Sequence, residues 1–290
     1  MFFKLCKYEF KSILRTLVPI YLAVIAVSFI NMFMGVGSLS NGYYNNLIQN
    51  ISFGKDILGL FQTVSMFAYF GVMVALSVLT LIVIIQRFYK GLLCDEGYLM
   101  FTLPVKPWLL IAAKGTTALV MTVASGITAG ISILMLLIGA LGPVDFFAAV
   151  ASPELWLKIG QLFQAVPSWP LLMLEVLVLI IFSGFSKLFH LYFSMSLGHL
   201  ANRHRILMSV VAYIGISMVL SFISGFFMIM ANSIPFFQTF FNSINFDSGI
   251  SGFTAAMHLV LIASIVACVI QSAIFFFGSE RILSKYLNLE

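Results

Sequence analysis

The chain has 290 residues, of which 61% are hydrophobic and only 9% are charged. Soluble domains carry roughly 25% charged residues, so this composition cannot build a water-facing surface and excludes soluble enzymes and binding modules. The net charge of +5 does not indicate a nucleic-acid partner, because the basic residues flank long apolar runs. The cysteines Cys6, Cys94 and Cys268 have neither metal-site nor disulfide spacing. We therefore expect a polytopic protein of the lipid bilayer.

Residues 2–16 interleave apolar and basic side chains. Lys4, Lys7 and Lys11 recur at intervals of three and four residues, which places them on one face of a helix. Such a helix would lie in the cytoplasmic interface of the membrane, attracted by anionic lipid. The alternative is an ordinary cationic lead-in to the first span. A cleavable signal peptide is not expected, because no short apolar region ends in a small-residue cleavage site.

Six apolar runs follow that can cross a bilayer, judged on a window of about 20 residues. We therefore expect an all-α integral membrane fold, with six transmembrane helices and an N-terminal amphipathic interfacial helix in a single domain over residues 1–290. The loop of residues 143–170 is expected to contain a short amphipathic segment. The expected spans cover residues 17–35, 61–86, 109–141, 171–192, 206–231 and 255–277.

Lysine and arginine residues gather on one side of these spans, and the positive-inside rule assigns that side to the cytoplasm. Only Lys55 and Lys158 fall on the other side. Because the number of spans is even, both termini are expected in the cytoplasm. The basic residues on the cytoplasmic side are Lys4, Lys7, Lys11, Arg15, Arg87, Lys90, Lys106, Lys114, Lys187, Arg203, Arg205, Arg281 and Lys285.

The cytoplasmic loop of residues 87–108 is where charged residues, glycine, proline and aromatic residues crowd together. Gly97 permits a tight turn, and Asp95 and Glu96 suit the start of a helix, whose dipole favours acidic side chains. A short apolar segment follows, and two prolines then end regular structure. The pattern predicts a short, rigid, amphipathic element that either docks on a soluble partner or forms a plain turn pinned at the interface.

The same loop resembles a segment of the ABC-2-type permeases. Asp95-Glu96-Gly97-Tyr98-Leu99, then Thr102-Leu103-Pro104-Val105 and an apolar stretch ending in Lys114, is similar to the segment between the second and third spans of bacterial six-span permease subunits. The sequence departs from the family pattern at Gly115, where a small polar or apolar residue more often follows the lysine. The resemblance implies a coupling helix seated on a separate ATPase subunit that holds ATP and magnesium. The residues implied in coupling are Asp95, Glu96, Gly97, Tyr98, Leu103, Pro104 and Lys114.

A second basic cytoplasmic loop covers residues 194–205. Its histidines, His199 and His204, could suggest a metal site, but no carboxylate or cysteine lies nearby in the sequence to complete a ligand set, so no metal is expected. By the resemblance, this loop is the second contact with the ATPase. The residues implied there are Gly198, Arg203, His204 and Arg205.

Glu175 lies inside the fourth expected span, where an ionisable group is costly and is a functional candidate. Together with His258 in the sixth span, it could line an outward-facing part of a translocation path. Two small-residue patterns, Gly126–Gly130 and Ser221–Gly225, permit close approach between helices. We expect both patterns to pack inside one subunit rather than between two subunits.

No GxxxxGK[ST], HExxH or GxSxG motif occurs in the sequence, so no ATPase domain, no cofactor and no enzymatic activity are expected of this chain. The sequence predicts the permease subunit of an ATP-driven exporter in the bacterial cytoplasmic membrane, paired with an identical or related permease subunit. An amphipathic or hydrophobic substrate, such as a peptide antibiotic or a lipid-like compound, would suit its composition. The alternatives are a secondary transporter or channel, and a non-transporting membrane scaffold or sensor. A membrane-embedded enzyme comes last, because the sequence shows no plausible nucleophile or metal set.

Overall fold

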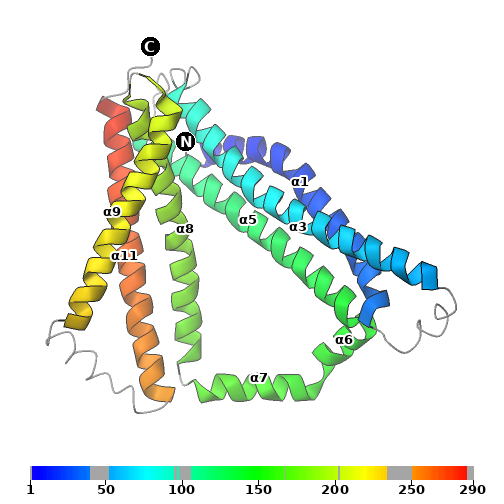
Figure 1. The fold of residues 1–290 in the computed structure, drawn as a ribbon. Helices are drawn as coiled ribbons and strands as arrows, with labels where there is room; N and C mark the ends of the chain where they lie inside the picture. The colour runs from blue at the N-terminus through cyan, green and yellow to red at the C-terminus, as the bar shows by residue number, and fades with distance from the viewer. Residues whose placement is uncertain are drawn as a thin grey trace. The chain divides into compact units, whose positions relative to one another are not determined.

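The computed structural model describes residues 2–39, 52–94, 97, 106–166, 168–201, 203–233 and 250–285, and every regular element in those ranges is a helix (Figure 1). A π-helical turn, η1 (Tyr89–Leu93), directly follows α3. The α-helices are α1 (Phe2–Leu39), α3 (Ser52–Phe88), α5 (Pro107–Leu141), α6 (Pro143–Ala151), α7 (Pro153–Ala165), α8 (Trp169–His199), α9 (Arg205–Ser233) and α11 (Ile250–Lys285).

Within the described ranges, six helical stretches are long and apolar enough to cross a membrane, as expected from the sequence. Their bounds extend several of the expected spans at one or both ends. They are Phe2–Phe33, Leu60–Leu93, Pro107–Leu141, Trp169–His199, Arg205–Phe227 and Gly252–Lys285.

Helix α1 is longer than the expected first span. It runs over 38 residues with Pro19 inside it, and at 1.5 Å per residue it is about 57 Å long, against about 30 Å for the hydrocarbon core of a bilayer. Residues 2–16 therefore form the first turns of α1 rather than a helix of their own. An amphipathic interfacial role for these turns stays a prediction.

Two short helices, α6 and α7, take the place of the single amphipathic segment expected after α5. Each begins with a proline, Pro143 or Pro153, which suits the first helical position because the missing N–H would have no helical partner there. Gly142, between α5 and α6, has φ of 86°, a left-handed conformation that glycine adopts without steric cost.

Contacts along the chain define two units, each described here by itself. The first unit comprises Phe3–Ile85 and Val120–Lys158. In it, α3 runs antiparallel to α1 and α5, as the hydrogen bonds of Asn31 to Ser65 and of Thr80 to Ser125 indicate. The core of this unit is a buried apolar cluster from the three helices, made of Ile13, Leu17, Val83 and Met121.

The second unit comprises Gln86–Leu119 and Ile159–Glu290, and α8 packs in it against both α9 and α11. The ring of His190 on α8 stacks on Tyr213 of α9 and on Phe275 of α11, with centroid distances of 4.5 and 4.9 Å. Ser186 Oγ donates to Gln271 Oε1 at 2.8 Å, which joins α8 to α11 a turn earlier. The prediction of one domain over residues 1–290 is not tested by this division.

Glycines mark close approaches between helices, but not at the patterns expected from the sequence. A Cβ built on Gly126, Gly130 or Gly225 meets no atom within 4 Å, so no helix approaches these glycines closely within their own units. The expectation that these patterns pack inside one subunit stays a prediction. A Cβ on Gly139 would instead lie 2.6 Å from the backbone of Met32. Spacing reveals a face of small residues but not whether a neighbouring helix covers that face.

Candidate functional site

The end of α3 changes geometry just before the expected coupling segment. The π-helical turn η1 buries Gly91, Leu92 and Leu93, and Cys94 then adopts an extended backbone. Gly97 N donates to Cys94 O at 2.7 Å, and a Cβ on Gly97 would lie 2.6 Å from Leu92 O. The turn expected at Gly97 is therefore present, and it is tight enough to require glycine.

Five of the residues expected in the coupling segment lie outside the described residues, and two lie within them. Gly97 forms the turn above, and Lys114 lies in the second turn of α5. The five outside the described ranges are Asp95, Glu96, Tyr98, Leu103 and Pro104.

Lys114 is only 5% exposed, and its ammonium group lies against the end of α3. Lys114 Nζ donates to Arg87 O at 3.1 Å, and a Cβ on Gly91 would lie 2.6 Å from the same nitrogen. The last carbonyls of a helix lack helical donors and carry partial negative charge, so a cation there is favourable. Lys114 therefore acts from α5 as a cap on α3, in a space that Gly91 leaves open.

Tyr192 on α8 completes this arrangement. Its hydroxyl donates to Lys114 O at 3.3 Å, and its ring stacks on Phe88 with a centroid distance of 3.9 Å and an angle of 11°. Phe88 and Tyr192 are both almost fully buried. A Cβ on Gly115 would lie 2.7 Å from the Phe189 ring, so glycine at this position permits close approach of α8. We call Arg87, Phe88, Gly91, Lys114 and Tyr192 the α3–α5 junction.

The end of α8 and the turn that follows it pack on η1, next to this junction. The ring of His199 is buried and lies 6.2 Å from the ring of Tyr89 in η1, and its side chain hydrogen-bonds to the backbone of Leu93. Arg205 Nη1 donates to His199 Nε2 at 3.3 Å. His199 thus joins the start of α9 to the turn that precedes residues 95–105.

The four residues expected at the second contact have different surroundings. Gly198 is a packing residue, because a Cβ there would collide with the backbone and side chain of Ser209. Arg205 turns back to His199, whereas Arg203 and His204 are exposed. His204 has a left-handed backbone, with φ of 55°, and its carbonyl accepts from Met208 N at the start of α9. Among the described residues, no group of three or more His, Cys, Asp and Glu side chains could hold a metal ion.

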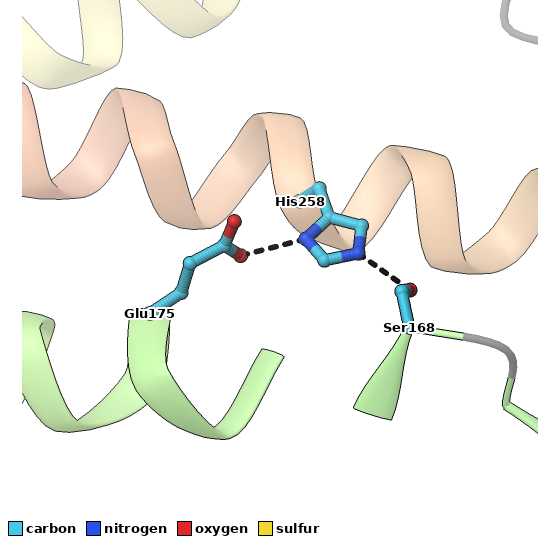
Figure 2. Close-up of polar contacts among 3 residues, drawn as sticks. All are labelled: Ser168, Glu175 and His258. Atoms are coloured by element: carbon cyan, nitrogen blue, oxygen red, sulfur yellow. Dashed lines mark hydrogen bonds and ion pairs between the residues drawn. The ribbon is translucent and has the colours of Figure 1, made fainter. Parts of the chain in front are cut away.

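The structure brings Glu175 and His258 together near the first turns of α8 and α11 (Figure 2). His258 Nδ1 lies 2.8 Å from Glu175 Oε2, and His258 Nε2 lies 2.7 Å from Ser168 Oγ. The Glu175 side chain is 9% exposed and that of His258 is 18% exposed. This is a continuous chain of hydrogen bonds from a buried carboxylate, through an imidazole, to a hydroxyl group.

Sequence reasoning missed Phe88, Gly91, Tyr192 and Ser168. Nothing in a single sequence signals that Tyr192 faces Lys114 across 78 positions. Ser168 stands before Trp169-Pro170, a pattern typical of a helix start, but the pattern says nothing of a partner 90 residues away. Gly91 could have been found only by knowing that a lysine lies opposite it.

Comparison of the chain with protein-family models, with curated proteins and with solved structures finds no match.

Proposed function

We propose that this chain is the membrane-spanning permease subunit of an ATP-binding-cassette exporter in a bacterial cytoplasmic membrane. Six apolar helices of membrane-spanning length support this proposal, as do the resemblance of residues 95–114 to ABC-2-type permeases and the lack of a nucleotide-binding motif in the sequence. A separate ATPase subunit would bind ATP and magnesium. A second permease subunit, identical or related, would complete the path through the membrane.

The α3–α5 junction is the observation that carries the proposal. In the sequence, residues 95–105 connect the end of η1 to the start of α5, and Lys114 joins α3 to α5 through Arg87 O. Tyr192 adds α8 to the same packed set. Close-packed side chains transmit displacement with little loss, because interiors have low compressibility. Movement of a partner against residues 95–105 would therefore shift α3, α5 and α8 together.

The contacts of His199 extend this argument to the second proposed contact. The turn between α8 and α9 is attached to η1 through Tyr89 and Leu93. The turn between α8 and α9 thus packs on η1, which directly precedes the first segment proposed to meet the ATPase. Arg203 and His204 are the exposed residues of that turn, and we propose that they face the partner.

Sidedness and substrate follow from charge and composition. The distribution of basic residues supports a cytoplasmic location for the α3–α5 junction, both termini and the turn between α8 and α9. Glu175 and His258 would then lie toward the opposite side, beside the translocation path. An amphipathic or hydrophobic substrate suits the apolar surfaces that α3, α5 and α9 expose.

The test is ATPase retention. The full chain is purified in mild detergent from its native membranes and photolabelled with 8-azido-ATP, and the labelled polypeptide is identified by mass. We expect the label on a second chain, with ATP turnover in the same fraction. Glu96→Ala combined with Pro104→Ala should release that chain, because both residues lie in the segment proposed to dock.

Pro153→Ala combined with Glu154→Ala is the matched control. It removes the same residue types from α7, where both are exposed, and it should leave the labelled chain bound. Release by both double variants would indicate a general loss of integrity. Retention of the ATPase by the Glu96/Pro104 variant, or a wild-type chain that purifies alone without ATP turnover, would contradict the proposal.

A further inference from the structure

The hydrogen-bond chain of Ser168, His258 and Glu175 has the atom-by-atom order of a nucleophile, a general base and an orienting acid (Figure 2). The hydroxyl lies 2.7 Å from His258 Nε2, and the carboxylate lies 2.8 Å from Nδ1 on the other side of the same ring. Both distances fall in the range of about 2.6–3.2 Å expected between the members of such a set. An ionised carboxylate only accepts hydrogen bonds, so Nδ1 carries the proton and Nε2 is left to accept from the hydroxyl.

Glu175 is buried, whereas His258 and Ser168 are both partly exposed. Glu175 is the most buried of the three side chains and His258 is more exposed, while Ser168 is only partly covered in the turn before α8. The Glu175 carboxylate is therefore shielded from water, and its hydrogen bond to the imidazole is stronger than it would be in water. The hydroxyl remains within reach of a substrate that approaches from outside the helix pair.

The Ser168 hydroxyl does not cap the N-terminus of α8, although Ser168 occupies the N-cap position. Ser168 is the residue before α8, and its carbonyl accepts the first helical bond, from Leu172 N, at 3.1 Å. A serine at this position usually bonds through its hydroxyl to an N–H of the first turn. Ser168 makes no such bond, and its hydroxyl goes to His258 instead.

We propose that Ser168 is a nucleophile for carboxylic esters of amphipathic compounds, with His258 as its general base and Glu175 as a positioning residue. Trp169 and Leu171 are large, exposed apolar residues beside Ser168, and they suit the apolar chain of such an ester. No local sequence motif marks Ser168, Glu175 and His258 as a catalytic set, because α8 and α11, on which they meet, are far apart in the sequence. The proposal is independent of the permease function, since it requires neither ATP nor a partner chain.

The reaction proceeds in two balanced steps. Ser168 Oγ bonds to the ester carbonyl carbon as its proton passes to His258 Nε2, the ester C–O bond breaks, and the departing alcohol takes that proton. Water then loses a proton to His258 Nε2 and attacks the acyl group, the bond to Ser168 Oγ breaks, and the proton returns to that oxygen. The acid leaves and the serine is restored.

Covalent labelling tests the nucleophile directly. The purified full chain in detergent is treated with a fluorophosphonate probe, which bonds to an activated serine oxygen as its P–F bond breaks. Peptide mass mapping should place the adduct on Ser168. His258→Asn should slow the labelling by about 100-fold or more, the lower bound for loss of a general base. Ser264→Ala, at an exposed serine of α11 that bonds to Val260 O, should label at the wild-type rate.

The role of Glu175 is tested by the maximal labelling rate. A purely structural role would not lower this rate while leaving the half-saturating probe concentration unchanged. Glu175→Gln should lower the maximal labelling rate while the half-saturating probe concentration stays unchanged, and Glu175→Asp should restore part of the rate. Each variant is compared at equal recovery of monodisperse protein. A wild-type chain with no adduct on Ser168, or equal labelling of wild type and His258→Asn, would overturn the proposal and leave the permease function untouched.

Discussion

Gly91 leaves the space that the Lys114 ammonium occupies, so Gly91→Ala should weaken the α3–α5 junction. The new Cβ would lie 2.6 Å from Lys114 Nζ and 3.3 Å from its Cε, whereas favourable contacts between heavy atoms lie at about 3.5–4.0 Å. The ammonium must therefore move by about 1 Å, and the 3.1 Å bond to Arg87 O is lost.

The size of the effect follows from two opposing contributions. A hydrogen bond from a charged donor contributes about 1.5–3 kcal/mol. Alanine in place of glycine inside a helix stabilises the helix by about 0.5–1 kcal/mol. We expect Gly91→Ala to lower the free energy of unfolding by about 0.5–2.5 kcal/mol. The free energy is measured by titration with sodium dodecyl sulfate in mixed micelles, followed by circular dichroism.

A double-mutant cycle separates this cause from general strain. In Lys114→Met the side chain ends one atom earlier and carries no ammonium, so adding Gly91→Ala should change stability little. The coupling between the two substitutions should be about 1–2 kcal/mol. A coupling below about 0.5 kcal/mol, or no loss of stability in Gly91→Ala alone, would refute the assignment of Lys114 to this space.

Other contacts make predictions for the same unfolding assay. Gly198→Ala should destabilise by about 1–3 kcal/mol through overpacking. Gly126→Ala, on an open face, should stabilise by up to about 1 kcal/mol. A Gly198→Ala variant more stable than Gly126→Ala would contradict the packing described. Tyr192→Phe keeps the ring stack on Phe88 and should cost no more than about 1 kcal/mol. Tyr192→Ala removes the ring and should cost about 3–5 kcal/mol. Equal losses of stability in the two variants would show that the stack contributes little. Ser186→Ala removes the bond to Gln271 and should cost about 0.6 kcal/mol, the average for hydrogen bonds between membrane helices; a loss above about 2 kcal/mol would contradict this view.

The set of long apolar helices was predictable because each helix depends on the length and hydropathy of its own stretch of sequence. Run length and hydropathy identify six spans, and the helix at Leu60–Leu93 needs nothing beyond its own residues to be recognised. The turn at Gly97 was also predictable, and a Cβ there would lie 2.6 Å from Leu92 O. The end of the helix was not, because the expected span stopped at residue 86 and the helix continues to Leu93. The extension of α1 through residues 2–16 was not predicted, because interleaved lysines suit both an interfacial helix and the start of a long one.

The details of the candidate sites depend on contacts between distant residues. Lys114 was expected in the coupling region, but its bond to Arg87 O depends on where α5 meets α3. No neighbour lies within 4 Å of a Cβ built on Gly126, which was not predictable because spacing reveals a face of small residues but not which helix covers it. Glu175 and His258 were paired as candidates, and the structure brings them into contact. Ser168 joined them only through a turn whose placement no local pattern fixes.

The composition of the native complex tests the proposed permease function most directly. The full chain, purified in mild detergent from its own membranes, is weighed intact by native mass spectrometry before and after addition of a non-hydrolysable ATP analogue with magnesium. The proposed function predicts two permease subunits with two ATP-binding chains, and nucleotide bound only to those chains. A mass equal to this chain alone, or to copies of it without any nucleotide-binding chain, would contradict that function.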